Sequence, residues 1–205
     1  MRRMALKVYG AARTRTVRTL WMMGELGMPY EHIPITTQDG ANLKPDYVAV
    51  NPTGRVPAID DGGFVLSESM AINLYLAKTY GGALYPATPQ GEARAWQWSF
   101  WAVTEIDKTI IEWALHSSVL PEAERDSKRA RAARLELERP LEMLEGALAH
   151  TLWLAEDRFT VADLNAASVM YRALWMDLDD KPHARDWLRR CWDRPAARAA
   201  RAMRE

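Results

Sequence analysis

Glu68 and Ser69 form a pair of side chains that could hold both charges of one small zwitterion. A carboxylate pairs with an ammonium group, and a hydroxyl donates a hydrogen bond to a carboxylate. Residues 68–80 have a helical pattern that a pair of glycines closes, and Ser67 is a suitable N-cap. The two side chains are therefore expected at the start of a helix, where unpaired backbone N–H groups and the positive end of the dipole favour a bound carboxylate.

The elements before this helix are predicted to be two short strands, over residues 56–60 and 64–67, joined by the tight turn DGG. Pro57 stands where the first strand should begin, and a proline donates no hydrogen bond to a strand ladder. A cis Val56–Pro57 bond would turn the backbone of Val56 outward. Each of these features has an ordinary structural explanation, but their order and spacing together favour a ligand site.

Two motifs in this stretch, NPTGRVP at residues 51–57 and SESMAINLYL at residues 67–76, resemble the glutathione-binding half of the cytosolic glutathione S-transferases. The closest resemblance is to a bacterial branch of serine type. It implies an α/β thioredoxin-like N-terminal domain (residues 1–82), a linker (83–93) and an all-α C-terminal domain (94–205) that supplies a second-substrate pocket. The implied function is a detoxifying glutathione transferase, which activates the glutathione thiol as a thiolate for attack on a small hydrophobic electrophile. A homodimer is implied as well.

Periodicity along the rest of the chain fits this division. The N-terminal part shows a strand over residues 5–10, a helix from Val17 to Gly27 and a strand over 30–36. Beyond residue 93 only helical patterns follow, over residues 94–116, 121–146 with a kink at Pro140, 182–192 and 195–204. Thr160 and Asp163 have the spacing of a capping box, and we assign this pair a role in folding rather than in chemistry.

The composition excludes several other classes of protein. Lys and Arg together number 27, as do Asp and Glu, so no net charge favours nucleic acid or a membrane surface. The single cysteine, Cys191, excludes an internal disulfide and a CxxC site, and the four scattered histidines predict no bound metal. No stretch approaches the roughly 18 apolar residues of a membrane span, and no signal peptide is evident. We therefore expect a cytoplasmic protein.

The implied reaction needs one hydrogen-bond donor near the glutathione sulfur. A thiol with a pKa of about 8.5 is only a few per cent ionised at pH 7. Lowering that pKa by about two requires about 2.7 kcal/mol, and one hydrogen bond to a charged acceptor supplies about 1.5–3 kcal/mol. A single well-placed donor is therefore sufficient.

The resemblance indicates Thr14 as this donor. In the serine-type branches a strand ending in Tyr-Gly is followed a few residues later by a catalytic serine, and counting from Tyr9 reaches Thr14. Threonine carries the same donor on a stiffer side chain. The rival candidates are Arg13, Arg15, Thr16 and Tyr9. The loop holds no cysteine, which argues against the branches that form a mixed disulfide.

The resemblance also assigns the residues that hold the substrates. It implies that the Val56 backbone and Pro57 hold the cysteinyl part of glutathione, and that Glu68 and Ser69 bind its γ-glutamyl end. Arg55 and Lys44 are candidates for the glycyl carboxylate, and Arg55 also for the γ-glutamyl end. The second-substrate pocket is expected to involve Trp98, Trp101 and Glu105, which are spaced three and four residues apart.

Two other functions are compatible with the sequence. The threonine at the serine position leaves open a glutathione-binding carrier or interaction protein without transferase activity. Arg194, Arg198 and Arg201 follow one side of the last predicted helix and could contact nucleic acid, although nearby acidic residues and the balanced net charge make this patch modest.

Overall fold

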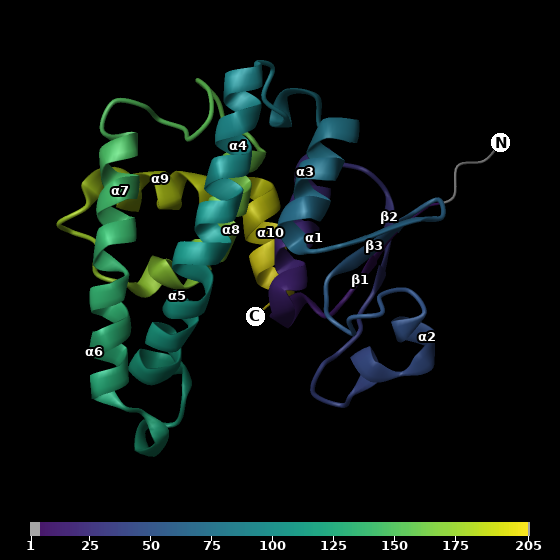
Figure 1. Cartoon of the computed structure of the whole chain (residues 1–205), viewed down its shortest axis with the longest axis horizontal. Coiled ribbons are helices and arrows are strands. Elements are labelled where there is room, and N and C mark those ends of the chain that lie inside the picture. The colour runs from purple at the N-terminus through teal and green to yellow at the C-terminus, as the bar shows by residue number, and fades with distance from the viewer. Residues whose placement is uncertain (1–4, 205) are drawn as a thin grey trace. The chain divides into compact units, whose positions relative to one another are not determined.

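The computed structural model describes residues 5–204 (Figure 1). The chain forms two compact units, each with most of its contacts within itself. The first unit comprises the residues up to Tyr85 together with those from Asp193 onward, and the second unit comprises Pro86–Trp192. The boundary after Tyr85 falls within residues 83–93, the predicted linker.

The first unit contains a four-stranded mixed sheet. Its strands are β1 (Leu6–Tyr9), β2 (Tyr30–Ile33), β3 (Ala58–Asp61) and β4 (Phe64–Ser67), in the order β2-β1-β3-β4. Strand β1 is parallel to β2 and antiparallel to β3, and β3 and β4 form a hairpin. Gly62 and Gly63 occupy the hairpin turn with φ of 65° and 99°, the positive values that a two-residue turn requires. The predicted α/β fold of the first unit and its tight turn are confirmed.

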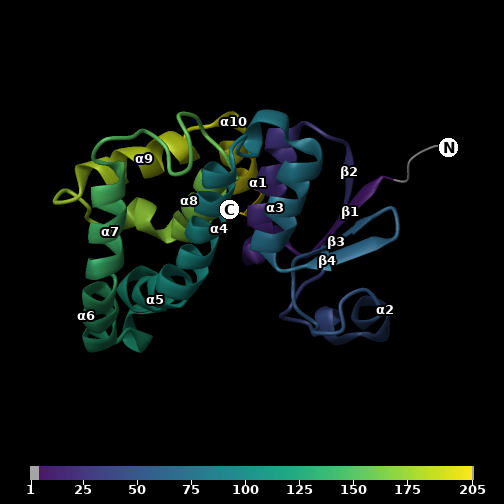
Figure 2. The same cartoon turned by 45° about the horizontal axis from the view of Figure 1, so that its top comes forward.

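Helices α1 (Val17–Leu26) and α3 (Ser69–Tyr80) pack against each other on one face of this sheet (Figures 1 and 2). Trp21 on α1, and Ile72 and Leu76 on α3, are completely buried. Helix α1 ends at Gly27, where φ is 61°, as the sequence predicted. A short helix, α2 (Pro45–Val48), precedes the loop that leads into β3.

Three predicted boundaries differ from the structure. The strand predicted over 30–36 ends at Ile33 because Pro34, which follows, has no N–H to donate. Strand β3 begins at Ala58 rather than 56 for the same reason, and the Val56–Pro57 peptide bond is cis. The prediction of Ser67 as the N-cap is wrong: Ser67 ends β4, and Glu68 is the N-cap of α3.

Helix α10 (Pro195–Arg204) belongs to the first unit, whereas the sequence placed residues 94–205 together in the helical domain. It packs along α1 (Figures 1 and 2), and the close approach depends on small residues. A Cβ atom at Gly24 would lie 3.0 Å from the Cβ of Ala196. Near the C-terminal end of α1, Arg194 binds Glu25 with both guanidinium arms, Nε and Nη2, at 2.7 Å each.

The second unit is helical. It contains α4 (Pro89–Trp101), α5 (Asp107–Ala114), α6 (Ser127–Glu136), α7 (Glu138–Leu148), α8 (Val161–Val169) and α9 (Pro182–Trp192). The single helix predicted over residues 94–116 is two α-helices, because a π-helical wide turn at Ala102–Ile106 separates α4 from α5. The helix predicted over 121–146 divides at Leu137 into α6 and α7. Pro140 therefore lies in the first turn of α7, where no N–H is needed.

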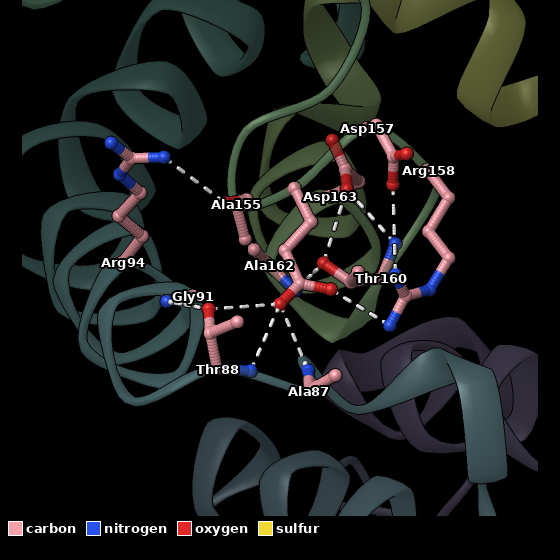
Figure 3. Close-up of polar contacts among 11 residues, drawn as sticks. Ala87, Thr88, Gly91, Arg94, Ala155, Asp157, Arg158, Thr160, Ala162 and Asp163 are labelled. Carbon is pink, nitrogen blue, oxygen red and sulfur yellow. Dashed lines mark hydrogen bonds and ion pairs between the residues drawn. The ribbon is translucent and has the colours of Figure 1, made fainter.

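Helix α8 is buried along its whole length. The predicted capping box is confirmed: the Thr160 hydroxyl accepts from the backbone, and the Asp163 carboxylate accepts from the Thr160 N–H at 3.0 Å (Figure 3). Asp163 also accepts hydrogen bonds from the Leu154 N–H and the Trp187 indole, at 2.9 Å each. Burial raises the pKa of Asp163 to about 6 although these donors favour the carboxylate.

A second carboxylate, that of the partly buried Glu156, fixes the start of α4. The main-chain N–H groups of Ala87 and Thr88, both labelled in Figure 3, donate to its Oε1 at 2.9 and 3.1 Å. Gly91 leaves room for this carboxylate, because a Cβ atom there would lie 2.5 Å from Oε1.

Among residues 5–204, no helix has both the length and the apolar character that crossing a membrane requires.

Candidate active site

The loop that follows β1 and the segment that precedes β3 meet at Gly10. Its φ of +125° and the crowding around it permit only glycine. A Cβ atom there would lie 2.0 Å from Oγ1 of Thr16 and 2.9 Å from Cβ of Val56. The loop that carries Thr14 therefore lies beside Val56 and the cis peptide bond. His32 on β2 also contacts Gly10, since its ring nitrogen Nε2 is 2.8 Å from the Gly10 carbonyl oxygen.

Thr14 is half-buried in this loop and makes three short-range contacts. Its hydroxyl donates to the Ala11 carbonyl at 2.7 Å and lies 2.8 Å from the hydroxyl of Thr16. The same oxygen accepts the Thr16 N–H at 3.1 Å. Thr14 itself is extended, with φ of −99° and ψ of −168°, between residues that already turn into α1. This break gives the residue a backbone direction different from that of its neighbours.

The rival donors have different surroundings. Thr16 is completely buried, and Arg13 and Arg15 are exposed. Tyr9 is buried in a cluster with Tyr47, whose ring centroid is 6.0 Å away, and burial raises the pKa of Tyr9. Because its ring packs in this cluster, Tyr9 belongs to the core.

A network of hydrogen bonds fixes the backbone just before Val56. The Arg55 carbonyl accepts from the Tyr47 hydroxyl at 2.6 Å and from Asn51 Nδ2 at 2.7 Å. Asn42 Nδ2 donates to the Gly54 carbonyl at 2.7 Å. The main chain of the motif is thus held from three directions, and the peptide groups of Val56 and Pro57 have a defined orientation.

Two cationic side chains in this region, Arg55 and Lys44, are exposed. The guanidinium of Arg55 has no hydrogen-bond or ion-pair partner in the part of the chain that the structure describes. Lys44, the N-cap of α2, is exposed as well. Both cations could therefore pair with a ligand carboxylate.

Glu68 and Ser69 lie at the N-terminus of α3, as the sequence predicted, but in an unexpected backbone conformation. Glu68 has φ of 71° and is the only residue other than glycine with positive φ within 5–204. Such a conformation costs about 1–3 kcal/mol and is common at ligand sites. The Glu68 side chain is exposed and makes no hydrogen bond within residues 5–204, whereas Ser69 is only 5% exposed.

Arg18 joins this helix start to α1. Arg18 is 5% exposed, and its Nη1 donates to the Ser69 hydroxyl at 3.4 Å. Asn73 on α3 donates to the Arg18 carbonyl at 3.3 Å. Because arginine can only donate, the Ser69 hydroxyl acts as the acceptor in this contact and keeps its own proton for a ligand carboxylate.

The first unit thus brings together three predicted parts of the glutathione site: the Thr14 loop, Val56–Pro57 and the start of α3. Sequence reasoning missed several residues that hold these parts in place. They lie far apart in sequence and carry no motif of their own: Arg18, His32, Asn42, Tyr47 and Asn51.

The residues predicted for the second-substrate pocket belong to the second unit. Trp98 and Trp101 are buried and meet edge to face, with ring centroids 5.0 Å apart. The indole nitrogen of Trp101 is buried without a hydrogen-bond partner among the described residues. Glu105 is exposed and lies on the wide turn after α4, so the three residues do not share one regular helix face as the spacing predicted.

Comparison with known proteins identifies the family. The models of the N-terminal and C-terminal domains of glutathione S-transferases match residues 4–78 and 106–195. Glutathione S-transferase 3 of Zea mays is 33% identical, over 95% of this chain and 90% of its own. Glutathione S-transferase GstB of Escherichia coli (strain K12) is 31% identical, over 90% of this chain and 91% of its own.

Solved structures agree with this result. The theta class glutathione S-transferase of Xanthomonas axonopodis pv. citri, solved with glutathione bound, is 33% identical with a TM-score of 0.88, covering 96% of each chain. A glutathione S-transferase-I bound with lactoylglutathione is 26% identical with a TM-score of 0.87, covering 97% of this chain and 99% of its own. The resemblance seen in the sequence is confirmed, and the chain belongs to the glutathione S-transferase family, with its thioredoxin-like N-terminal and helical C-terminal architecture.

Proposed function

We propose that this glutathione S-transferase binds glutathione across its first unit and activates the thiol through the hydroxyl of Thr14. The observation that carries the proposal is the meeting of the Thr14 loop and Val56 at Gly10. Arg18 adds the start of α3 to the same region through Ser69. A relative of the same architecture holds glutathione in its crystal structure, which supports this ligand.

Each end of the tripeptide has a complementary group. Glu68 pairs with the γ-glutamyl ammonium, while Ser69 and the backbone N–H groups of α3 take the adjacent carboxylate. The Val56 backbone pairs with the cysteinyl peptide group beside Pro57. The glycyl carboxylate is left for the exposed cations, Arg55 and Lys44.

The hydrogen bonds around Thr14 allow it to donate to sulfur. If Thr16 donates its hydroxyl proton to the Thr14 oxygen, the Thr14 proton can leave the Ala11 carbonyl and point to the thiolate. The thiol proton passes to solvent. The sulfur then forms a bond to the electrophilic carbon, and the leaving group departs with its bonding electron pair.

Steady-state kinetics with an aryl chloride test this assignment. Replacing the hydroxyl, in Thr14→Ala, should lower kcat about 10-fold or more with little change in KM for glutathione, since one charge-assisted hydrogen bond is lost in the reacting state. Thr14→Ser keeps the donor and should retain activity. A variant that loses affinity for glutathione but keeps kcat would move the donor to another residue.

A second candidate function is a glutathione carrier without turnover. The Thr14 proton already has an acceptor at 2.7 Å in the Ala11 carbonyl, and this contact favours a hydroxyl that is not available to sulfur. Retention on immobilised glutathione without turnover of any electrophile would support the carrier. Retention together with turnover of an aryl halide supports the enzyme.

The proposal includes a cytoplasmic homodimer that takes a small hydrophobic electrophile, in line with the cytosolic family that the sequence resembles. In the second unit, three large apolar side chains are exposed at helical spacing, Trp96, Phe100 and Val103. Exposed apolar stripes of this kind are typical of protein interfaces. The stripe therefore supports a contact with a second copy of the chain.

A further inference from the structure

Helix α10 is held against α1 in one fixed register. Arg194 binds both carboxylate oxygens of Glu25, and Trp21 donates its indole N–H to the same carboxylate at 2.9 Å. Bidentate arginine–carboxylate pairs fix orientation as well as distance. The close approach of Gly24 to Ala196 adds a second contact between the two helices. The opposite end of α10 therefore reaches a defined place beside the start of α1.

At that place Arg204 contacts the loop that carries the proposed thiol donor. Its Nη1 donates to the Arg13 carbonyl at 2.8 Å and to the Thr14 carbonyl at 3.3 Å. These two carbonyls flank the backbone of Thr14, the extended residue within the turn. A guanidinium that bonds both carbonyls restrains the two peptide planes, and with them the direction of the Thr14 side chain.

We propose that Arg204 is a positioning residue for Thr14, and that α10 acts as a strut that holds the thiol-activating loop. The inference rests on the proposed function, in which the Thr14 hydroxyl stabilises the glutathione thiolate. Without the strut the loop would keep its local bonds to Ala11 and Thr16, but the orientation of the Thr14 peptide groups would be less restricted. Small errors in orientation at a reacting group lower rates strongly.

The test compares Arg204→Met with Arg198→Met, a matched control on the same helix. Arg198 is exposed and pairs with Asp193. Two ligands separate thiol activation from binding: glutathione, which ionises, and S-methylglutathione, which cannot. The readouts are the fraction of bound glutathione present as thiolate, from its ultraviolet absorbance across pH, kcat/KM with an aryl chloride, and the affinity for S-methylglutathione.

Arg204→Met should lower kcat/KM at neutral pH about 10-fold and shift the thiolate titration to higher pH, because a misdirected hydroxyl stabilises the thiolate less. Affinity for S-methylglutathione should stay within about twofold, and Arg198→Met should match the wild type. In a Thr14→Val background, Arg204→Met should have little further effect, because both act through one hydroxyl.

An Arg204→Met variant with the wild-type thiolate titration would overturn the inference. So would an equal loss of affinity for S-methylglutathione, which would make the contact a general structural one. Absence of bound thiolate in the wild type would overturn the proposed function itself.

Discussion

At the scale of single residues, the proposed site depends on the hydroxyl of Thr14 and the carboxylate of Glu68. The Thr14 hydroxyl lies between the Ala11 carbonyl and the Thr16 hydroxyl, so a small rotation redirects its proton. The Glu68 carboxylate makes no hydrogen bond within residues 5–204 and is held by a backbone that only glycine adopts easily. The backbone conformation of Glu68 costs free energy, and such conformations are typical of ligand sites.

Glu68→Ala should weaken glutathione binding by more than about 1 kcal/mol, because the ligand ammonium loses its charged partner. Isothermal titration calorimetry measures this loss directly. Glu31→Ala, which removes an exposed carboxylate on β2, serves as the control and should bind as the wild type does. Unchanged affinity in Glu68→Ala would remove Glu68 from the site.

Glu68→Gly and Glu68→Ala should differ in stability although both lack the carboxylate. Glycine adopts a φ of 71° without steric cost, whereas alanine keeps the strain. We expect the glycine variant to be more stable by about 1 kcal/mol in chemical denaturation. Equal stability of the two variants would show that the positive φ at this position is not costly.

At the scale of elements, hydrogen bonds to carboxylates fix the starts of two helices, to Asp163 at α8 and to Glu156 at α4. The pKa of Asp163 is shifted. The capping box at the start of α8 places Asp163 where burial raises its pKa from the ordinary 3.8 to about 6. The folded state therefore binds this proton more tightly than the unfolded state does. Stability from this group is fully present below pH 3.8 and is lost as the pH rises through about 6.

The unfolding free energy of the wild type should therefore decrease by about 3 kcal/mol relative to Asp163→Asn between pH 3.8 and pH 7. The asparagine removes the titration, and other ionisable groups cancel in the difference. Asp157→Asn is the control, since the Asp157 side chain is 93% exposed and should show no relative change. A flat difference for Asp163→Asn would show that its pKa is ordinary.

The sequence predicted those features of the fold that depend on neighbouring residues. The DGG turn, Gly27 after α1 and the box of Thr160 with Asp163 each depend on residues within a few positions of one another. The Ser67 cap failed because the true start of α3 is set by a backbone turn at Glu68 that no propensity favours. The place of α10 was missed because it depends on Arg194 meeting a residue 169 positions away.

At the scale of the whole molecule, the sequence predicted the family architecture because its two motifs stand on elements that the fold must contain. The residues that hold the proposed site in place could not be predicted from the sequence. Arg18, Tyr47 and Arg204 contact the motif segments through backbone carbonyls or a buried hydroxyl, and such contacts leave no spacing pattern.

Phe100→Glu should convert the proposed homodimer into a monomer, because it places a charge within the exposed apolar stripe of Trp96, Phe100 and Val103. Phe100 is 60% exposed, and Leu135 on α6, 68% exposed, offers a control of similar exposure in Leu135→Glu. Light scattering during gel filtration gives the mass of each. A wild type that is already monomeric, or a Phe100→Glu variant that stays dimeric, would place the interface elsewhere or remove it.

The most direct test of thiol activation by Thr14 is the pH titration of glutathione bound to the wild type, Thr14→Ser and Thr14→Val. The bound thiol should be mostly thiolate at neutral pH in the wild type and in Thr14→Ser. In Thr14→Val its pKa should return toward the value of about 8.5 for a free thiol. A Thr14→Val complex that titrates like the wild type would show that the Thr14 hydroxyl does not activate the thiol.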